Sequence, residues 1–396
     1  MNLLPQTREL VGPDEPGTLL PGKHPTPRGR EAHNLNRAPR WTVSVAHMKL
    51  SIVELATVSP GTTERDALAD ALRTAQHADA LGLHRVWFAE HHVTATQASH
   101  NPEVLVAATA ARTSGIRVGS GGVLLNNYSP LKVAEVFQQL EAMFPGRIDL
   151  GMGRATSGPV IDTALRRDRS SRPTDDHQQQ VTEVLAWLHE AFPEEHPFAG
   201  HPLMPSVPEV PQTWLLGSSP GGSNLAAGLG IGYTFAGFIN PGAAAAALRN
   251  YRDTFRPTGF GPSEPRAILA VNVSVGATAE EAERLVSSPK GYYARLGVDP
   301  LSAMVPSADQ ALKEMSAEQR AEPTRITDGA WPRFVSGDPE QVNATLEQML
   351  SESGADELMV QNLIADPVDR RRSHALLAEV FGVEPRDAAR AAELES

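Results

Sequence analysis

Segments typical of buried strands alternate with segments typical of helices along most of this chain, and that alternation limits the possible folds more than any other feature. The strand-like segments are continuous apolar runs, as expected for parallel strands that are covered on both faces. They comprise residues 48–55, 85–90, 116–125, 147–155, 212–219, 232–238, 266–275 and 355–362.

Helix-like segments follow these runs, with apolar residues at helical spacing and stop signals at their ends. Gly82 ends residues 63–82, while Pro102 and Gly115 bracket the next helix. Residues 279–288 are predicted to be the seventh helix, and residues 339–354 a helix after the insertion that follows it. Alternation of this kind favours a parallel α/β sheet. Eight units in about 335 residues favour closure into a (β/α)8 TIM barrel over an open sheet.

The chain divides into three parts by composition. Residues 1–47 are rich in Pro, Gly and Arg without periodicity, which predicts a disordered N-terminal extension. Residues 48–383 form the predicted barrel domain, and residues 384–396 are expected to be a flexible C-terminal tail. Two loop insertions, residues 155–176 and 289–335, lie near the C-terminal face and are candidate lids.

Composition excludes several classes of function. A net charge of -12 argues against a nucleic-acid partner, because phosphate backbones need a basic surface. The chain has no cysteine, which excludes disulfides, thiolate metal sites and cysteine nucleophiles. No apolar run approaches the about 20 residues of a membrane helix, and the N-terminus lacks a secretory signal pattern. We expect a cytoplasmic protein.

The C-terminal ends of barrel strands carry function, so the residues there are informative. The stretch GSSPGGSN, residues 217–224, opens a helix and could cradle a phosphate with its backbone N–H groups and serine hydroxyls. Arg154, at the end of the fourth strand, could supply the cation. The alternatives are a turn with a serine N-cap and a surface ion pair, respectively.

Two other strand ends stand out. Gly121-Gly122 interrupts a β-branched strand, which indicates either a ligand against the backbone or packing against a bulky neighbour. Glu90-His91-His92 ends the second strand. Adjacent strand residues point to opposite sides, which disfavours a metal site there. A neutral imidazole beside a reaction centre remains, and so does a structural histidine, above all for His92.

With these motifs, the chain resembles the bacterial-luciferase-like family of flavin-dependent oxidoreductases, in its non-luminescent, single-subunit branch. The matching segments are MKLSIVEL, RVWFAEHH, residues 101–155, TWLLGSSPGGSNLAAGLGIGYTFA and VSGDPEQVNATLEQML. The resemblance implies a barrel that binds reduced flavin mononucleotide (FMN) and, in monooxygenase members, reacts it with dioxygen to oxidise a small organic substrate.

The resemblance also implies roles for individual residues. Gly121 and Gly122 match a pair joined by a cis peptide under the flavin ring, and Arg154 matches a phosphate-binding arginine. His91 matches an active-site histidine that assists the oxygen chemistry, with Glu90 orienting the site. The phosphate cradle maps to Ser218, Ser219, Gly221, Gly222 and Ser223. Ser218 and Gly222 depart from the luciferases, which have an acidic and a hydroxyl residue there, so the contact could shift towards Ser223.

Three functions follow from this resemblance. The first is an FMN-dependent monooxygenase, with a role in secondary metabolism and a separate NAD(P)H:flavin reductase as partner, since LGMGRA is not a dinucleotide-binding fingerprint. The second is a dehydrogenase or reductase that uses a deazaflavin coenzyme. The third is a non-catalytic flavin-binding homologue. Family members are often dimers, so a homodimer is expected.

Overall fold

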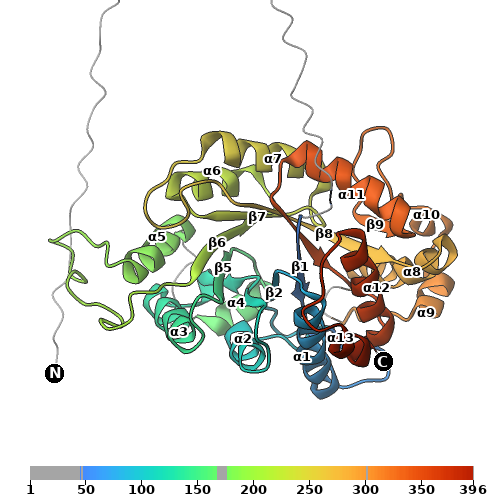
Figure 1. Ribbon diagram of the computed structural model, residues 1–396, viewed down its shortest axis with the longest axis horizontal. Coiled ribbons are helices and arrows are strands. Elements are labelled where there is room, and N and C mark those ends of the chain that lie inside the picture. Colours follow the sequence, from blue (N-terminus) through green and yellow to red (C-terminus); the bar gives the residue numbers. More distant parts are fainter. Residues whose placement is uncertain (1–44, 46–47, 167–175, 300–301, 396) are drawn as a thin grey trace, which may run out of the picture. The chain divides into compact units, whose positions relative to one another are not determined.

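Eight parallel strands close into a barrel in the computed structural model, which describes residues 45, 48–166, 176–299 and 302–395 (Figure 1). Hydrogen-bonded neighbours follow the order β1-β2-β3-β5-β6-β7-β8-β10, and β10 pairs with β1 to close the ring. The strands are β1 (Lys49–Glu54), β2 (Arg85–Phe88), β3 (Arg117–Ser120), β5 (Ile148–Gly153), β6 (Gln212–Gly217), β7 (Gly232–Ala236), β8 (Ala267–Val275) and β10 (Glu357–Gln361). The predicted TIM barrel is confirmed.

Helices surround the barrel and bury their apolar faces on the strands (Figure 1). They are α1 (Glu64–Leu81), α2 (Pro102–Ala110), α3 (Pro130–Met143), α5 (His177–Leu188), α6 (Pro220–Leu229), α7 (Pro241–Thr254), α11 (Pro339–Ser353) and α12 (Pro367–Val380). The start and stop signals act as expected at α1, where Thr63 and Asp66 form a capping box and Gly82 adopts the left-handed conformation. None of the helices in the described part of the chain is long and apolar enough to cross a membrane.

The insertion after β8 is larger than the sequence predicted. The helix expected over 279–288 continues through Pro289 as α8 (Ala279–Leu296), followed by α9 (Ala308–Glu314), α10 (Ala317–Arg320) and β9 (Phe334–Gly337). The ring position between α7 and α12 belongs to α11 (Figure 1). The whole stretch from α8 to β9 is therefore an insertion, because α11 buries the apolar face that covers this part of the barrel.

The predicted flexible tail from residue 384 is wrong for the residues described. Helix α13 (Ala388–Glu395) packs on α1, with Ala391 buried between them. The Arg371 Nε donates to the Leu394 carbonyl at 2.6 Å, and the Asp387 N–H donates to the Ala80 carbonyl at 3.1 Å. The small apolar face of α13 and these contacts to backbone carbonyls hold the C-terminal segment in place. The predicted N-terminal extension, residues 1–47, lies outside the described residues except for Val45.

A buried ion cluster closes the N-terminal end of the barrel. Arg85, near the start of β2, donates to Asp149 at 2.7 Å and to Glu357 at 2.6 Å, and its guanidinium lies over the Trp214 ring. Arg117 adds a second cation beside Asp149 at 2.7 Å. These charges satisfy one another, so the end of the barrel that is open to chemistry is the C-terminal one.

Candidate functional site at the C-terminal end of the barrel

The glycine pair after β3 lies inside the barrel mouth, and the peptide bond between Gly121 and Gly122 is cis, as the resemblance implied. A Cβ on Gly121 would lie 2.8 Å from the Trp87 Cβ, and one on Gly122 would lie 2.7 Å from the Gly151 carbonyl oxygen. The protein's own packing therefore requires glycine at both positions. Packing against a bulky neighbour, one of the two alternatives that the sequence left open, is thus present at Gly121, which lies against Trp87.

Glu90 holds this glycine segment in place. Its carboxylate is buried and accepts three hydrogen bonds: from the Leu124 N–H at 2.9 Å, from the Tyr128 hydroxyl at 2.8 Å and from His92 Nε2 at 2.6 Å. Leu124 belongs to the short strand β4 (Val123–Leu124), directly after the glycine pair. Both carboxylate oxygens are thus engaged by protein donors, which makes Glu90 a positioning residue.

The two adjacent histidines have different surroundings. His92 is bound to Glu90, as expected for a structural histidine. His91 Nδ1 is buried and makes no hydrogen bond within the described part of the chain, while the His91 backbone N–H donates to the Ser99 carbonyl at 2.9 Å. Burial, aided by His92 and His100, lowers the pKa of His91 to about 4. At neutral pH the imidazole of His91 is therefore uncharged and suited to hydrogen bonding.

The turn from β6 into α6 is the segment predicted to cradle a phosphate. Ser219 is the N-cap of α6, yet within the described residues its hydroxyl makes no capping hydrogen bond, and a Cβ on Gly221 would meet none of their atoms within 4 Å. Tyr233 packs beneath the turn: Cβ atoms on Gly217 and Gly222 would lie 3.2 Å and 3.3 Å from its side chain. The first turn of the helix thus presents an open backbone and an available hydroxyl, which suits an anion.

The sequence placed Ser223 in the cradle, but the structure does not. Ser223 is fully buried, donates to the Pro220 carbonyl at 2.6 Å and accepts from Asn250 Nδ2 at 3.0 Å. Its position one turn into the helix directs the hydroxyl at the helix's own backbone. Ser218 lies in the turn, where its carbonyl accepts from Asn240 Nδ2 at 3.1 Å.

The backbone of Arg154 lies near the end of β6, where this turn begins. It follows directly after β5, and the pairing of Met152 with Leu215 places the end of β5 alongside the end of β6. Arg154 is exposed at this shared edge. A cation next to a helix N-terminus is the arrangement that an anionic phosphate requires, so these residues fit the phosphate of FMN.

The insertion reaches over the barrel mouth, as expected for the region 289–335. Tyr292 and Ala303 pack with Val53 and Leu55 in an apolar cluster within the barrel. The Tyr292 hydroxyl accepts from Gln97 at 2.9 Å, and the Thr96 hydroxyl donates to the Ala303 carbonyl. These bonds join the insertion to the loop that follows His91.

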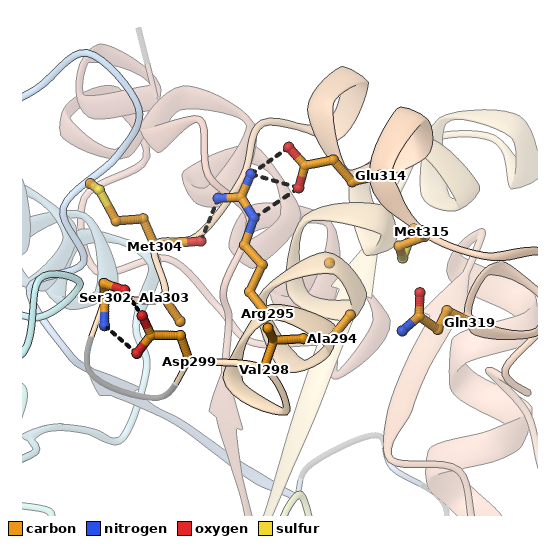
Figure 2. A pocket seen from close by; sticks show the side chains of 11 residues that line it. Ala294, Arg295, Val298, Asp299, Ser302, Ala303, Met304, Glu314, Met315 and Gln319 are labelled. Carbon is orange, nitrogen blue, oxygen red and sulfur yellow. Dashed lines mark hydrogen bonds and ion pairs between the residues drawn. The ribbon is translucent and has the colours of Figure 1, made fainter.

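Figure 2 shows a separate pocket of about 490 Å³ within the insertion. Arg295 crosses it and binds the Glu314 carboxylate at 2.7 Å and the Met304 carbonyl at 2.9 Å. Its guanidinium is therefore engaged in holding α8 to α9.

Two residues at the mouth were missed by sequence reasoning. Asn272 and Gln361 are paired neighbours on β8 and β10, and both side chains are buried. Each is a polar residue at an inward position of an apolar strand. That position is the signal that could have identified them, once the inward face of each strand was assigned.

Comparison with known proteins agrees with this geometry. Residues 48–357 match the family model described as luciferase-like monooxygenase. The chain belongs to the luciferase-like monooxygenase family. It is 39% identical to protein YwcH of Bacillus subtilis (strain 168), over 84% of this chain and 99% of the relative.

Two further proteins are similar to this luciferase-like monooxygenase over most of their length. N-acetyl-S-alkylcysteine monooxygenase of Bacillus subtilis (strain 168) is 33% identical, over 84% of this chain and 98% of that protein. The crystal structure of apo-MsnO8 has 40% sequence identity and a TM-score of 0.77, covering 86% of this chain and 100% of MsnO8.

Proposed function

We propose that this enzyme uses reduced FMN and dioxygen to oxidise a small organic substrate. The observation that carries the proposal is the cradle at the start of α6, where an available Ser219 hydroxyl and an open Gly221 lie beside Arg154. A phosphate monoester is the ligand that best matches a helix N-terminus with an adjacent guanidinium.

The remaining residues would serve the ring and the reaction. Bound FMN supplies the electrons that activate dioxygen. The backbone at Gly121 and Gly122 offers a flat surface for the ring, and Glu90 fixes that surface through Leu124. His91, neutral at physiological pH, would donate or accept a hydrogen bond at the reacting oxygen. The insertion would exclude water from the mouth.

Two solved structures with the same fold bear on the choice of cofactor, one with FMN and one that depends on F420. The oxygenating constituent of 3,6-diketocamphane monooxygenase, solved with FMN, shares the fold at 22% identity and a TM-score of 0.61. An F420-dependent secondary alcohol dehydrogenase shares the fold at 14% identity and a TM-score of 0.57. A deazaflavin coenzyme would therefore be the alternative ligand of the same cradle.

Anaerobic titrations separate the two proposals. We expect reduced FMN to bind more tightly than riboflavin, because riboflavin lacks the phosphate. Tighter binding of a deazaflavin coenzyme than of FMN would favour the dehydrogenase. Supply of reduced FMN by an NAD(P)H:flavin reductase, a homodimeric state, a cytoplasmic location and a role in secondary metabolism stay predictions.

A further inference from the structure

The amide side chains of Asn272 and Gln361 form a polar pair in an otherwise apolar part of the barrel mouth. Asn272 is 2% exposed and Gln361 is 7% exposed. The Asn272 Oδ1 and the Gln361 Oε1 have no hydrogen-bond partner among the residues that the structure describes. Buried polar atoms of proteins are normally hydrogen-bonded, so two adjacent unpaired acceptors indicate a ligand that donates to them.

Strand register connects this amide pair to the glycine platform, the backbone of Gly121 and Gly122. A Cβ on Gly121 would lie 3.3 Å from the Val53 Cγ2, Val53 pairs with Gln361, and Gln361 pairs with Asn272. Paired residues of parallel strands point to the same face. Gly121, Val53, Gln361 and Asn272 therefore form one row along the inside of the mouth.

The pair also lies opposite the platform. In the ring of eight strands, β8 stands across from β3, and β10 stands across from β5. A flat ring lying on the backbone of Gly121 and Gly122 would present its free face towards β8 and β10. A substrate bound between that face and the far wall would contact the amide pair.

The surroundings of the pair are apolar or aromatic. Ala270 and Met359 precede Asn272 and Gln361 on the inward faces of their strands, and both belong to the apolar cluster. Tyr293 of α8 flanks Asn272: burial raises the pKa of Tyr293, and a hydrogen bond from the Asn272 amide opposes that rise. The Arg333 guanidinium lies 5.3 Å from the centre of the Tyr293 ring, on the ring face.

We propose that Asn272 and Gln361 recognise an uncharged amide group on the substrate, through its N–H. The two unpaired side-chain oxygens call for a donor, and the N–H of a secondary amide supplies it. A cationic group is disfavoured, since neutral amides provide no counter-ion and the Arg333 guanidinium on the Tyr293 ring would repel it. This assignment rests on the proposed function, because it places the substrate beside the flavin ring.

The test uses matched pairs of small molecules, each a secondary amide and the ester of the same skeleton, which keeps the C=O but lacks the N–H. Binding to the FMN-loaded protein is measured by calorimetry for the wild type and for Asn272→Leu, Gln361→Met and the double variant. Gln138→Met is the matched control, because Gln138 is a buried amide that donates to Val207 and Glu209 carbonyls away from the mouth.

We expect the wild type to prefer at least one amide over its ester by about tenfold, as the loss of one buried hydrogen bond implies. That preference should vanish in the double variant and persist in Gln138→Met, with FMN affinity unchanged in both. No amide preference across the panel, or a preference that survives in the double variant, would overturn the proposal.

One other outcome would also overturn it. The imide edge of the flavin ring offers the same N–H chemistry, so loss of FMN affinity in the double variant would assign the pair to the flavin. A wild type that binds no FMN would instead refute the proposed function itself.

Discussion

Removing the Glu90 side chain should cost more stability than removing almost any exposed carboxylate. Glu90→Ala deletes three hydrogen bonds to a buried carboxylate and leaves the Leu124 N–H and the Tyr128 hydroxyl without their acceptor. Hydrogen bonds to a charged group contribute about 1.5–3 kcal/mol each, and those on one acceptor are not additive. We therefore expect the free energy of unfolding to fall by about 3–5 kcal/mol.

Glu90→Gln should be milder, because one amide oxygen can still accept from the Leu124 N–H, while the Tyr128 hydroxyl and His92 can rearrange as acceptors. We expect a loss of about 1–2 kcal/mol for this variant. FMN affinity should fall in Glu90→Ala, since Leu124 follows the glycine platform closely in the chain and anchors it to β2.

The assay is urea unfolding followed by circular dichroism, with FMN titration on the same samples. The control is Glu135→Ala, because Glu135 is exposed and its oxygen lies 3.7 Å from the Lys132 Nζ, a pair whose loss should change stability by less than about 1 kcal/mol. A Glu90→Ala protein as stable as the Glu135→Ala protein would refute the assignment of Glu90 as the residue that holds the platform.

Three further predictions test the cradle at the start of α6, the role of His91 and the burial of His374. Arg154→Ala and Ser219→Ala should each weaken FMN binding, and for Arg154→Ala the loss should be roughly ten- to a hundredfold. Riboflavin, which lacks the phosphate, should bind both variants as it binds the wild type, and an equal loss for riboflavin would contradict the phosphate contact. His91→Ala should keep FMN affinity but release more hydrogen peroxide per reduced flavin consumed, measured by a peroxide assay; unchanged coupling would remove His91 from the reaction. His374 on α12 is buried with neither ring nitrogen hydrogen-bonded within the described chain, and burial holds its pKa well below 6.5. As the pH falls, His374 takes up a proton in the unfolded chain at a higher pH than in the folded protein. The contribution of the neutral, buried His374 to the free energy of unfolding should therefore be complete above pH about 6.5 and decrease as the pH drops below it. His374→Leu should flatten that fall by at most about 1.4 kcal/mol per pH unit in urea unfolding at pH 5 to 7, and an unchanged slope would contradict the burial argument.

The sequence allowed the barrel to be predicted because each of its strands is a separate apolar run with its own helix. The ring helix after β8 was misassigned, since the segments 279–288 and 339–354 both have helical spacing, and only tertiary packing decides which one covers the barrel. The tail from 384 looked polar, yet a few small residues suffice to dock α13 on α1.

For the site, sequence motifs identified the residues that adjoin strand ends. Glu90, His91, Gly121 and Arg154 all lie at the C-terminal end of the barrel. The orientation of a hydroxyl within one turn could not be predicted, which is why Ser223 was misplaced. Asn272 was missed because it lies within an apolar strand, and only the strand register shows that its side chain faces the inside of the barrel.

The proposed activity depends on reduced FMN binding at the cradle of α6 and then reacting there with dioxygen. Anaerobic titration with reduced FMN, followed by rapid mixing with oxygenated buffer, tests both steps. We expect saturable binding and then an absorbance, matching neither reduced nor oxidised FMN, that outlasts the oxidation of free reduced FMN. Failure to bind reduced FMN, or binding without any change in its reaction with oxygen, would contradict the proposed activity.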